Sequence, residues 1–397
     1  MVARLTPSWH DSIKEIDATE WDQLLAGSEG ATPFLRHAWL SALETHGCAS
    51  AESGWEAHHL VLRDEQQVLQ AACPLYLKHH SYGEYVFDWA WADAYNRQLA
   101  TRSHQYYPKL LSAVPFSPIP GPRLLVSTQA RDKGLTLHLS DQLLGAMELQ
   151  QQERGISSAH LLFLTDQEAE AASQRGWLIR QGVQFHWQRA EDVALTSFDD
   201  LLATFQRDKR KKIKQERRRV AEAGIRFETR EGLDITREDW AFFYRCYAQT
   251  YLERGQQPYL TEDFWLDVGQ QLPGNWALII ALKEDRRVAC ALLALDRENR
   301  VAYGRYWGAL EQVDCLHFET CYYQPLAWCI RHGYKRFEGG AQGEHKLSRG
   351  LLPVSTLSAH WIGHPGFRDA VRHFLEREKN GVQHYVQELD ERTPFRT

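Results

Sequence analysis

Residues 278–296 read LIIALKEDRRVACALLALD: an apolar run, a charged turn at Glu284-Asp285, and a second run rich in small residues. Two such runs joined by a short charged turn predict a β-hairpin. Residues 59–77, HLVLRDEQQVLQAACPLYL, repeat that order about 220 residues earlier, with Asp64-Glu65 in the turn. The repeat favours two related α/β halves, and chance similarity between two hairpins is the competing explanation.

The segments after each hairpin are also alike. Each hairpin is followed by an aromatic stretch that we expect to be a strand, 84–91 in the first half and 301–307 in the second. A helix-like stretch with a Tyr-Tyr pair comes next in each half, at Tyr106-Tyr107 and at Tyr322-Tyr323.

Residues 201–223 form the clearest predicted helix, within a basic element spanning 198–223. Ser197 is a suitable N-cap, and Gly224 suits the position after the last turn. Between Arg207 and Arg219 the sequence has nine Lys or Arg and two acidic residues, in a chain whose net charge is −6. The apolar stripe is thin, and its members are Leu202, Phe205, Ile213 and Val220. A solvated face and a phosphate-binding face are both compatible with this pattern.

The order of the remaining elements predicts an α/β (α+β) fold. A strand at 225–229, helices at 237–253 and 262–272, the hairpin and the aromatic strand follow the basic helix, which is the order of an α/β acyltransferase domain. The first half is expected to close with a strand, a helix and a strand ending at Trp187. We therefore predict domains at 1–190 and 191–397, with C-terminal helices at 367–391.

Composition limits the class of protein. The 397 residues are 43% hydrophobic and 25% charged, which is typical of about two folded domains. No apolar run is long enough to span a bilayer and the start has no signal-peptide pattern, so we expect a cytoplasmic protein without a membrane span. Seven scattered cysteines and no His-Glu-x-x-His motif predict neither a disulfide framework nor a metal site. The negative net charge argues against DNA binding.

Several longer motifs carry a family resemblance. They are residues 74–78 (PLYLK), 83–88 (GEYVFD), 91–95 (WADAY), 115–118 (PFSP), 121–123 (GPR), 184–187 (QFHW), 304–308 (GRYWG) and 340–346 (GAQGEHK). Together they resemble the bacterial FemAB-like, GNAT-related proteins labelled "peptidoglycan biosynthesis/recognition", over nearly the whole chain. This resemblance implies tandem, duplicated GNAT-like acyltransferase domains.

The resemblance also implies an activity. Fem transferases move an amino acid from aminoacyl-tRNA onto an amine of a cell-wall precursor, with a basic helix and a Phe-Lys segment along the cleft. The basic helix is matched by 207–219, and the Phe-Lys segment resembles His345-Lys346 followed by Arg349-Gly350. The chain departs from the family in having His before the lysine and in lacking a coiled-coil arm, which puts tRNA use in doubt.

Residues 338–346, EGGAQGEHK, are the candidate catalytic segment. Acyl transfer to an amine needs a group that accepts the amine proton and donors for the developing oxyanion. Catalytic roles are assigned to Glu338, Glu344, His345 and Lys346, where Lys346 stabilises the donor carbonyl and His345 or Glu344 accepts the proton. Glu319 is a weaker base candidate. A glycine-rich turn with solvated charges is the alternative interpretation.

Substrate-binding roles are predicted for a wider set of residues, which are Asp93, Tyr95, Arg123, Lys211, Lys212, Arg217, Arg305, Trp307, Gln342 and Arg349. Of these, Asp93, Tyr95 and Arg123 form either a cleft wall or a satisfied core network. Residues 305–310, RYWGAL, are the nearest match to the pyrophosphate turn of an acetyl-CoA enzyme, but they fail at the last position and resemble a strand.

The leading hypothesis is an acyl- or aminoacyltransferase acting on an amine acceptor, a cell-wall precursor or other small molecule. It would have no permanently bound cofactor and would take aminoacyl-tRNA or acyl-CoA as donor. The alternatives are a conventional acetyl-CoA-dependent N-acetyltransferase and a non-catalytic binding protein for tRNA or a cell-wall fragment.

Overall fold

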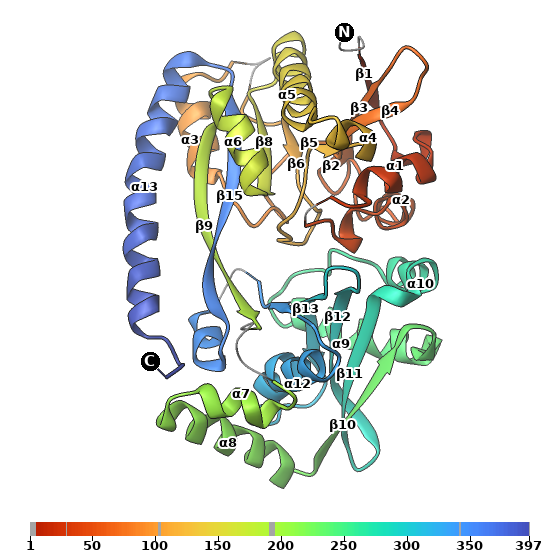
Figure 1. Ribbon diagram of the computed structural model, residues 1–397, viewed down its shortest axis with the longest axis vertical. Coiled ribbons are helices and arrows are strands. Elements are labelled where there is room, and N and C mark those ends of the chain that lie inside the picture. Colours follow the sequence, from red (N-terminus) through yellow and green to blue (C-terminus); the bar gives the residue numbers. More distant parts are fainter. Residues whose placement is uncertain (1–4, 29, 102–104, 190–194, 341–342, 397) are drawn as a thin grey trace. The chain divides into compact units, whose positions relative to one another are not determined.

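The structure is a computed structural model that describes residues 5–28, 30–101, 105–189, 195–340 and 343–396. The chain forms two compact units (Figure 1). Unit 1 comprises Met1–Gly182 and Ser355–His384, and unit 2 comprises Val183–Val354 and Tyr385–Thr397. The predicted boundary between residues 190 and 191 lies outside the described residues, so the division into 1–190 and 191–397 stays a prediction.

Unit 1 is built from two groups of strands with helices around them. Its strands are β1 (Thr6–His10), β2 (Trp55–Ala57), β3 (His59–Arg63), β4 (Leu69–Cys73), β5 (Tyr76–Lys78), β6 (Lys109–Ser112), β7 (Leu125–Val126) and β8 (Ser158–Leu164). Its helices are α1 (Ala18–Leu25), α2 (His37–Thr45), α3 (Trp89–Gln98), α4 (Thr128–Asp132), α5 (Thr136–Glu153) and α6 (Asp166–Gln174), with short 3-10 turns at Ile13–Glu15 and Pro33–Leu35.

The strands of unit 1 pair in the order β1-β3-β4-β7 and, with the C-terminal part of β15 (Leu352–Ile362), in the order β15-β8-β6-β5-β2. The pair β6·β8 is parallel and the other described pairs are antiparallel. The N-terminal part of β9 (Leu178–Gln188) and most of α13 (Pro365–Glu391) also belong to this unit. A cluster of buried apolar side chains from β3, β4, β8 and α5 forms part of its core.

Unit 2 contains the predicted catalytic segment and the basic helix. Its helices are α7 (Phe198–Thr204), α8 (Arg207–Glu222), α9 (Arg237–Leu252), α10 (Glu262–Gln271), α11 (Leu316–Phe318) and α12 (Gln324–Arg331), with a π-helical turn at Glu319–Tyr323 and 3-10 turns at Gly232–Asp234, Pro273–Asn275 and Glu344–Arg349. Its strands are β10 (Ile225–Glu231), β11 (Trp276–Lys283), β12 (Arg286–Asp296), β13 (Val301–Ala309) and β14 (Arg336–Glu338), together with the end of β9.

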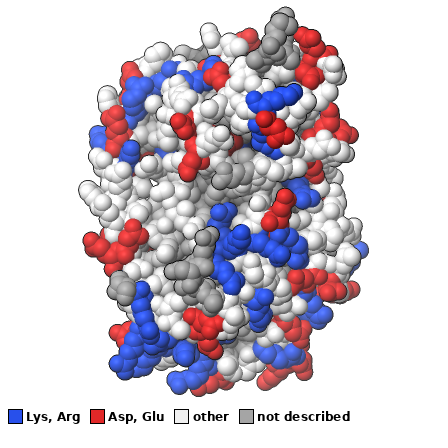
Figure 2. All heavy atoms as spheres, in the orientation of Figure 1, with Lys and Arg blue, Asp and Glu red and all other residues white. Residues whose placement is uncertain are grey.

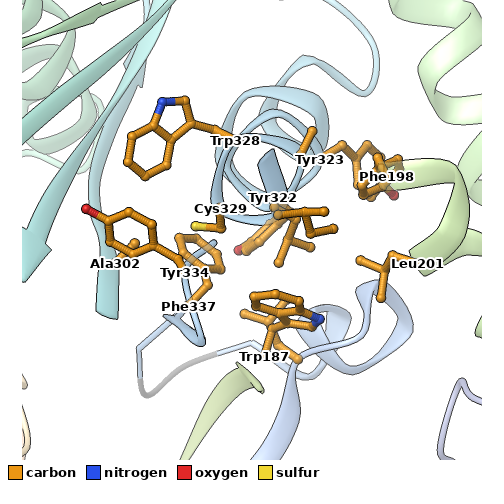
Figure 3. Packing of buried hydrophobic residues seen from close by; sticks show 14 of the residues in the cluster. Trp187, Phe198, Leu201, Ala302, Tyr322, Tyr323, Trp328, Cys329, Tyr334 and Phe337 are labelled. Carbon is orange, nitrogen blue, oxygen red and sulfur yellow. The ribbon is translucent and has the colours of Figure 1, made fainter. Parts of the chain in front are cut away.

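The strand order of unit 2 is β10-β11-β12-β13-β14-β9, and only β13·β14 is parallel among these described pairs. A cluster of buried side chains lies between this sheet and helices α7 and α12. Trp187, Tyr322 and Phe337 point into it from β9, the π-helical turn and β14 (Figure 3). Burying large aromatic side chains stabilises this side of the sheet and fixes the end of β14, where the catalytic segment begins.

The structure confirms both predicted hairpins and most of the second half. β3 and β4 pair antiparallel, as do β11 and β12, and β13 is the predicted aromatic strand. In the first half the prediction of a strand at 84–91 is wrong. Glu84 and Asp88 both bind the buried Lys109 ammonium, so the chain curls around that charge and α3 begins at Trp89.

Two further helix predictions need correction. Tyr106 and Tyr107 are not helical, because both hydroxyls reach back to the Asp88 carboxylate just before β6. The single helix predicted at 201–223 is two helices, since Phe205 has extended backbone and its ring packs on Phe395. The predicted ends are confirmed: the Ser197 side chain accepts from the Asp200 amide, and Gly224 has φ +75° after α8.

No described helix combines the length and the apolar character that crossing a bilayer requires.

Candidate functional site

The predicted catalytic segment leaves the core at the end of β14 and returns as a short helix. Glu344–Arg349 form a 3-10 helix, which starts after Gly343 with φ +97°. That backbone conformation strongly favours glycine, and it sets the direction in which the Glu344, His345 and Lys346 side chains leave the turn. Gln342, a predicted substrate-binding residue, lies outside the described residues.

The Lys346 side chain is 7% exposed, and its ammonium forms no hydrogen bond or ion pair with any described residue. Burial and, to a smaller extent, the nearby Arg305 guanidinium together lower the pKa of Lys346 to about 7, against a smaller opposing effect of Cys321. A largely desolvated amine with a strongly lowered pKa beside another charged group is typical of a functional site, which makes Lys346 a candidate for direct chemistry.

Glu338, at the end of β14, lies among two arginines and a histidine. Its carboxylate is 3.1 Å from Arg305, 3.0 Å from Arg336 and 3.8 Å from His186 Nε2. Strand register places these groups together, because Glu338 pairs with His186 of β9 on one side and with Tyr303 of β13 on the other. Burial lowers the pKa of His186 to about 4, so its imidazole is neutral at pH 7. The carboxylate of Glu338 therefore holds Arg305 in place beside Lys346.

His345 faces a group of aromatic rings. Its Nε2 is 3.0 Å from the Tyr322 hydroxyl, and its ring centroid lies 5.9 Å from those of both His317 and Phe318. Burial, followed by Arg349 and Lys346, lowers the pKa of His345, so the neutral imidazole prevails at pH 7. In the tautomer whose Nε2–H donates to the tyrosine oxygen, Nδ1 is free to accept a proton.

Glu344 points elsewhere. Its carboxylate side chain is 46% exposed and lies 3.1 Å from Arg392, near the C-terminus of the chain. The three consecutive residues predicted to act together are thus separated: Lys346 faces the core, His345 faces the aromatic rings, and Glu344 faces the C-terminal segment.

Arg349 is buried, and both of its terminal nitrogens donate hydrogen bonds. Its guanidinium lies 3.1 Å from the Glu216 carboxylate of α8, donates to the His345 carbonyl, and stacks 3.4 Å from the centroid of the Phe318 ring. The Tyr323 hydroxyl donates to the same Glu216 carboxylate. The structure therefore places Arg349 as the anchor between the catalytic segment and the basic helix.

The basic helix has two faces. Ile213, Glu216 and Val220 are buried, whereas Lys211 and Lys212 are exposed, as Figure 2 shows for the Lys and Arg gathered over α8. Arg217, grouped with these lysines by the sequence, instead lies 3.1 Å from Glu319 and 4.7 Å from the centroid of the Phe198 ring. The surface available for an anion is the lysine face.

The possible pyrophosphate turn at 305–310 lies mostly within β13. Arg305 is bound to Glu338, and Trp307 packs against His317 with 4.8 Å between ring centroids. Gly308 has a packing role, because a Cβ there would lie 1.8 Å from the Cys246 carbonyl oxygen of α9. These contacts give the motif a structural explanation that requires no cofactor.

The predicted residues of the first half are not brought together as one polar wall. Asp93 is exposed on α3, whereas Tyr95 is buried between the rings of Tyr106 and Phe367. Arg123 is 0% exposed and donates to backbone carbonyls of the loop that precedes it. Tyr95 and Arg123 fit the core-network interpretation.

Sequence reasoning missed three residues around Lys346 and His345. His186 lies within the QFHW motif and Tyr322 within the Tyr-Tyr pair, so both were visible as parts of longer patterns but not as site residues. His317 gave no signal. Burial lowers its pKa to about 4, with His345 as the next contribution, so it is a neutral neighbour of His345 at pH 7.

Comparison with known proteins gives one family and several solved structures of similar fold. The profile of the FemAB-like family, described as peptidoglycan biosynthesis/recognition, matches residues 12–397. No curated protein sequence matches the chain. Among solved structures, the C-terminal domain of a putative lysylphosphatidylglycerol synthetase from Agrobacterium fabrum has a TM-score of 0.53 at 11% identity, covering 92% of this chain and 97% of that one.

L-PGS from Bacillus licheniformis also has a TM-score of 0.53 at 11% identity, covering 90% of this chain and 97% of that one. These likenesses show a shared fold. With the family match, the predicted fold class of tandem GNAT-like α/β domains is confirmed. A tandem GNAT protein from the clavulanic acid biosynthesis pathway matches at 12% identity over 91% of this chain and 99% of that one, with a TM-score of 0.47.

Proposed function

Because the chain belongs to the FemAB-like family of peptidoglycan biosynthesis and recognition, we propose that it is an acyltransferase that moves an acyl or aminoacyl group onto an amine acceptor. The amine acceptor is a cell-wall precursor or another small molecule. The observation that carries the proposal is the Lys346 ammonium, which is held in a largely buried position beside the Arg305 guanidinium and has no partner among the described residues.

Lys346 is suited to stabilise the charge that develops on the donor carbonyl. When protonated, its ammonium is a strong donor in a poorly solvated position, where an oxyanion gains more from a hydrogen bond than it would in water. Arg305 adds positive charge to the same region, because its guanidinium is only partly neutralised by sharing Glu338 with Arg336.

His345 is the preferred proton acceptor. An attacking amine must lose a proton during transfer, and a neutral imidazole with a free Nδ1 can take it. The Glu344 carboxylate is the second choice, because it is held by Arg392 in the described structure.

The donor remains aminoacyl-tRNA or acyl-CoA. The lysine face of α8 suits a polyanionic donor. One solved structure of the same fold is named a putative lysylphosphatidylglycerol synthetase, and this name is the reason to keep an aminoacyl donor among the candidates. The conventional acetyl-CoA alternative has less support, since Arg305 and Gly308 of the possible pyrophosphate turn are occupied in packing.

A ligand screen followed by a transfer assay tests the proposal. Thermal unfolding is measured with CoA thioesters, with UDP-linked cell-wall precursors and with charged tRNA, because a ligand that binds the native state raises the unfolding temperature. Binding donors are then labelled in the acyl group and incubated with amine acceptors. Label recovered in an amide supports the proposal. Binding of tRNA or a cell-wall fragment without transfer to any acceptor would instead favour the non-catalytic alternative.

A further inference from the structure

We propose that Lys346 is itself a site of covalent acylation, at which Nζ attacks the carbonyl carbon of a bound thioester or ester donor when no amine acceptor is present. The inference rests on the proposed function only in that the donor carbonyl must reach the catalytic segment. Lys346 thus has two roles, stabilisation of charge during transfer and acceptance of the acyl group on Nζ.

The environment of Lys346 differs from that of the other buried lysines. Three lysines of the chain are buried: Lys78, Lys109 and Lys346, with exposed fractions of 0%, 1% and 7%. Lys109 lies between Glu84 and Asp88, at 2.8 and 2.5 Å. Lys78 donates to the His80 carbonyl at 2.6 Å and lies 4.6 Å from the centroid of the Trp55 ring. Of the three, Lys346 alone has no such partner among the described residues.

A lone pair is available on this nitrogen near neutral pH. The pKa of Lys346 is lowered to about 7 by burial and by Arg305, so about half of the molecules carry a neutral Lys346 amine at pH 7. An ordinary lysine is neutral in only about one molecule in 10³ at that pH. No described residue forms a hydrogen bond with this nitrogen, so attack on an acyl carbon breaks no interaction that the described part of the chain makes.

The chemical step is aminolysis of an activated acyl group. The Nζ–C bond forms, the C–S bond of a thioester or the C–O bond of an ester breaks, and the proton lost from nitrogen passes to the leaving sulfur or oxygen. The product is a neutral amide, which neither carries the positive charge of the ammonium nor donates its acyl group readily. Acylation therefore removes the proposed oxyanion donor and stops transfer.

The test uses p-nitrophenyl acetate, a small activated ester, on the full-length chain between pH 6 and pH 10. Acetylation is located by peptide mass mapping after short incubations. Lys78 is the matched control, because its pKa is also lowered to about 7 by burial while its ammonium is fully buried and partnered. Lys335 is the exposed control.

At pH 7, Lys346 is expected to be acetylated at least about ten-fold faster than Lys335, and its rate should be half-maximal near pH 7. Lys78 should stay unmodified. The Lys346→Arg variant should lose this signal and keep that of Lys335. Equal rates at Lys346 and Lys335, or labelling of Lys346 only near pH 10, overturn the inference.

The labelling result and the transfer assay separate this inference from the proposed function. Acetylation of Lys346 without transfer to any amine supports the inference and removes the enzyme proposal. Transfer to an amine by a protein whose Lys346 is not acetylated supports the proposed function and overturns this inference.

Discussion

Glu216 of the basic helix and Arg349, at the end of the 3-10 helix that begins within the candidate catalytic segment, form a buried ion pair, with 3.1 Å between the carboxylate and the guanidinium. One acidic residue in a strongly basic helix thus fixes the segment that carries Lys346. Arg349 also donates to the His345 carbonyl, so the pair acts directly on the backbone of that segment.

Glu216→Gln is expected to destabilise the fold, because it leaves the Arg349 guanidinium buried without its counter-charge. Removing one partner of a buried ion pair costs about 3–5 kcal/mol in free energy of unfolding. Denaturant unfolding measures this difference. The control is Arg218→Gln, which removes an exposed pair with Glu222 and should change stability by less than about 0.5 kcal/mol. Equal effects of the two variants would show that the Glu216–Arg349 pair is not an anchor.

Lys346→Ala is expected to lower turnover about 10²-fold, the usual effect of removing a donor to a developing oxyanion. Glu344→Gln should have a smaller effect, because the carboxylate is held by Arg392. Initial rates of acyl transfer are compared after circular dichroism has shown an intact fold. Lys335→Ala, an exposed lysine near β14, is the control and should leave turnover unchanged. Full activity of Lys346→Ala would refute the proposed role of this residue.

The pH dependence of transfer should have two limbs. Charge stabilisation requires protonated Lys346, so kcat/KM is expected to fall as the pH rises through about 7. Proton acceptance requires neutral His345, whose pKa is lowered from 6.5, so the acid limb should lie below pH 6.5. In Lys346→Arg the guanidinium stays charged, and the alkaline limb should move upward. An alkaline limb that is identical in the variant would assign it to another group.

The lowered pKa of Lys346 also affects stability. The unfolded chain binds this proton up to a pKa of about 10.5, whereas the folded chain releases it above about 7. Folding therefore carries a penalty below pH 7 that is progressively relieved between pH 7 and 10.5. Lys346→Met should remove that part of the pH dependence, as measured by denaturant unfolding at pH 6.5 and at pH 9.

Much of the second half was predictable because its signals are local. The turn at Glu284-Asp285, the Ser197 cap and Gly224 each act within a few residues, and the structure has them as expected. Glu216 illustrates the limit. In the sequence it is one of two acidic residues within a basic run and gives no sign of being buried. Its burial depends on Arg349 and Tyr323, which are more than 100 residues away in the chain.

The first half shows the same limit. Residues 84–91 have the composition of an aromatic strand, but a buried Lys109 attracts two carboxylates from that stretch and bends it. Within the catalytic segment, the residue types were visible from the sequence. The separation of Lys346 from Glu344 was not, because it depends on which residue of the turn faces the sheet.

Gly308→Ala tests whether the glycine of the possible pyrophosphate turn is needed for packing. A methyl group there would overlap the Cys246 carbonyl oxygen, so β13 and α9 would have to separate. We expect a loss of about 3 kcal/mol or failure to fold. Gly274→Ala is the control, because nothing lies within 4 Å of the added methyl group. A stable Gly308→Ala protein that has lost CoA binding would restore the acetyl-CoA alternative.

The exposed face of α8 can be separated experimentally from its buried face. Lys211, Lys212 and Lys214 are exposed, whereas Arg217 pairs with Glu319, whose side chain is 4% exposed. Arg217→Gln should therefore act on stability, since it leaves a buried carboxylate without its counter-charge. Neutralising the three lysines should hardly change folding, because exposed charges contribute little to stability.

The variant Lys211→Gln, Lys212→Gln, Lys214→Gln is expected to bind charged tRNA, or whichever polyanion raises the unfolding temperature, more weakly than the wild type. Each lost phosphate contact lowers the slope of log affinity against log salt by about 1, so the slope should become shallower as well. Affinity is titrated at two salt concentrations. The matched control makes the same change in net charge at exposed lysines outside α8, namely Lys133, Lys335 and Lys379. Because net charge alone would weaken both variants equally, a selective effect of the α8 variant assigns phosphate binding to this helix, and parallel curves for all three proteins would mean that the face is only solvated.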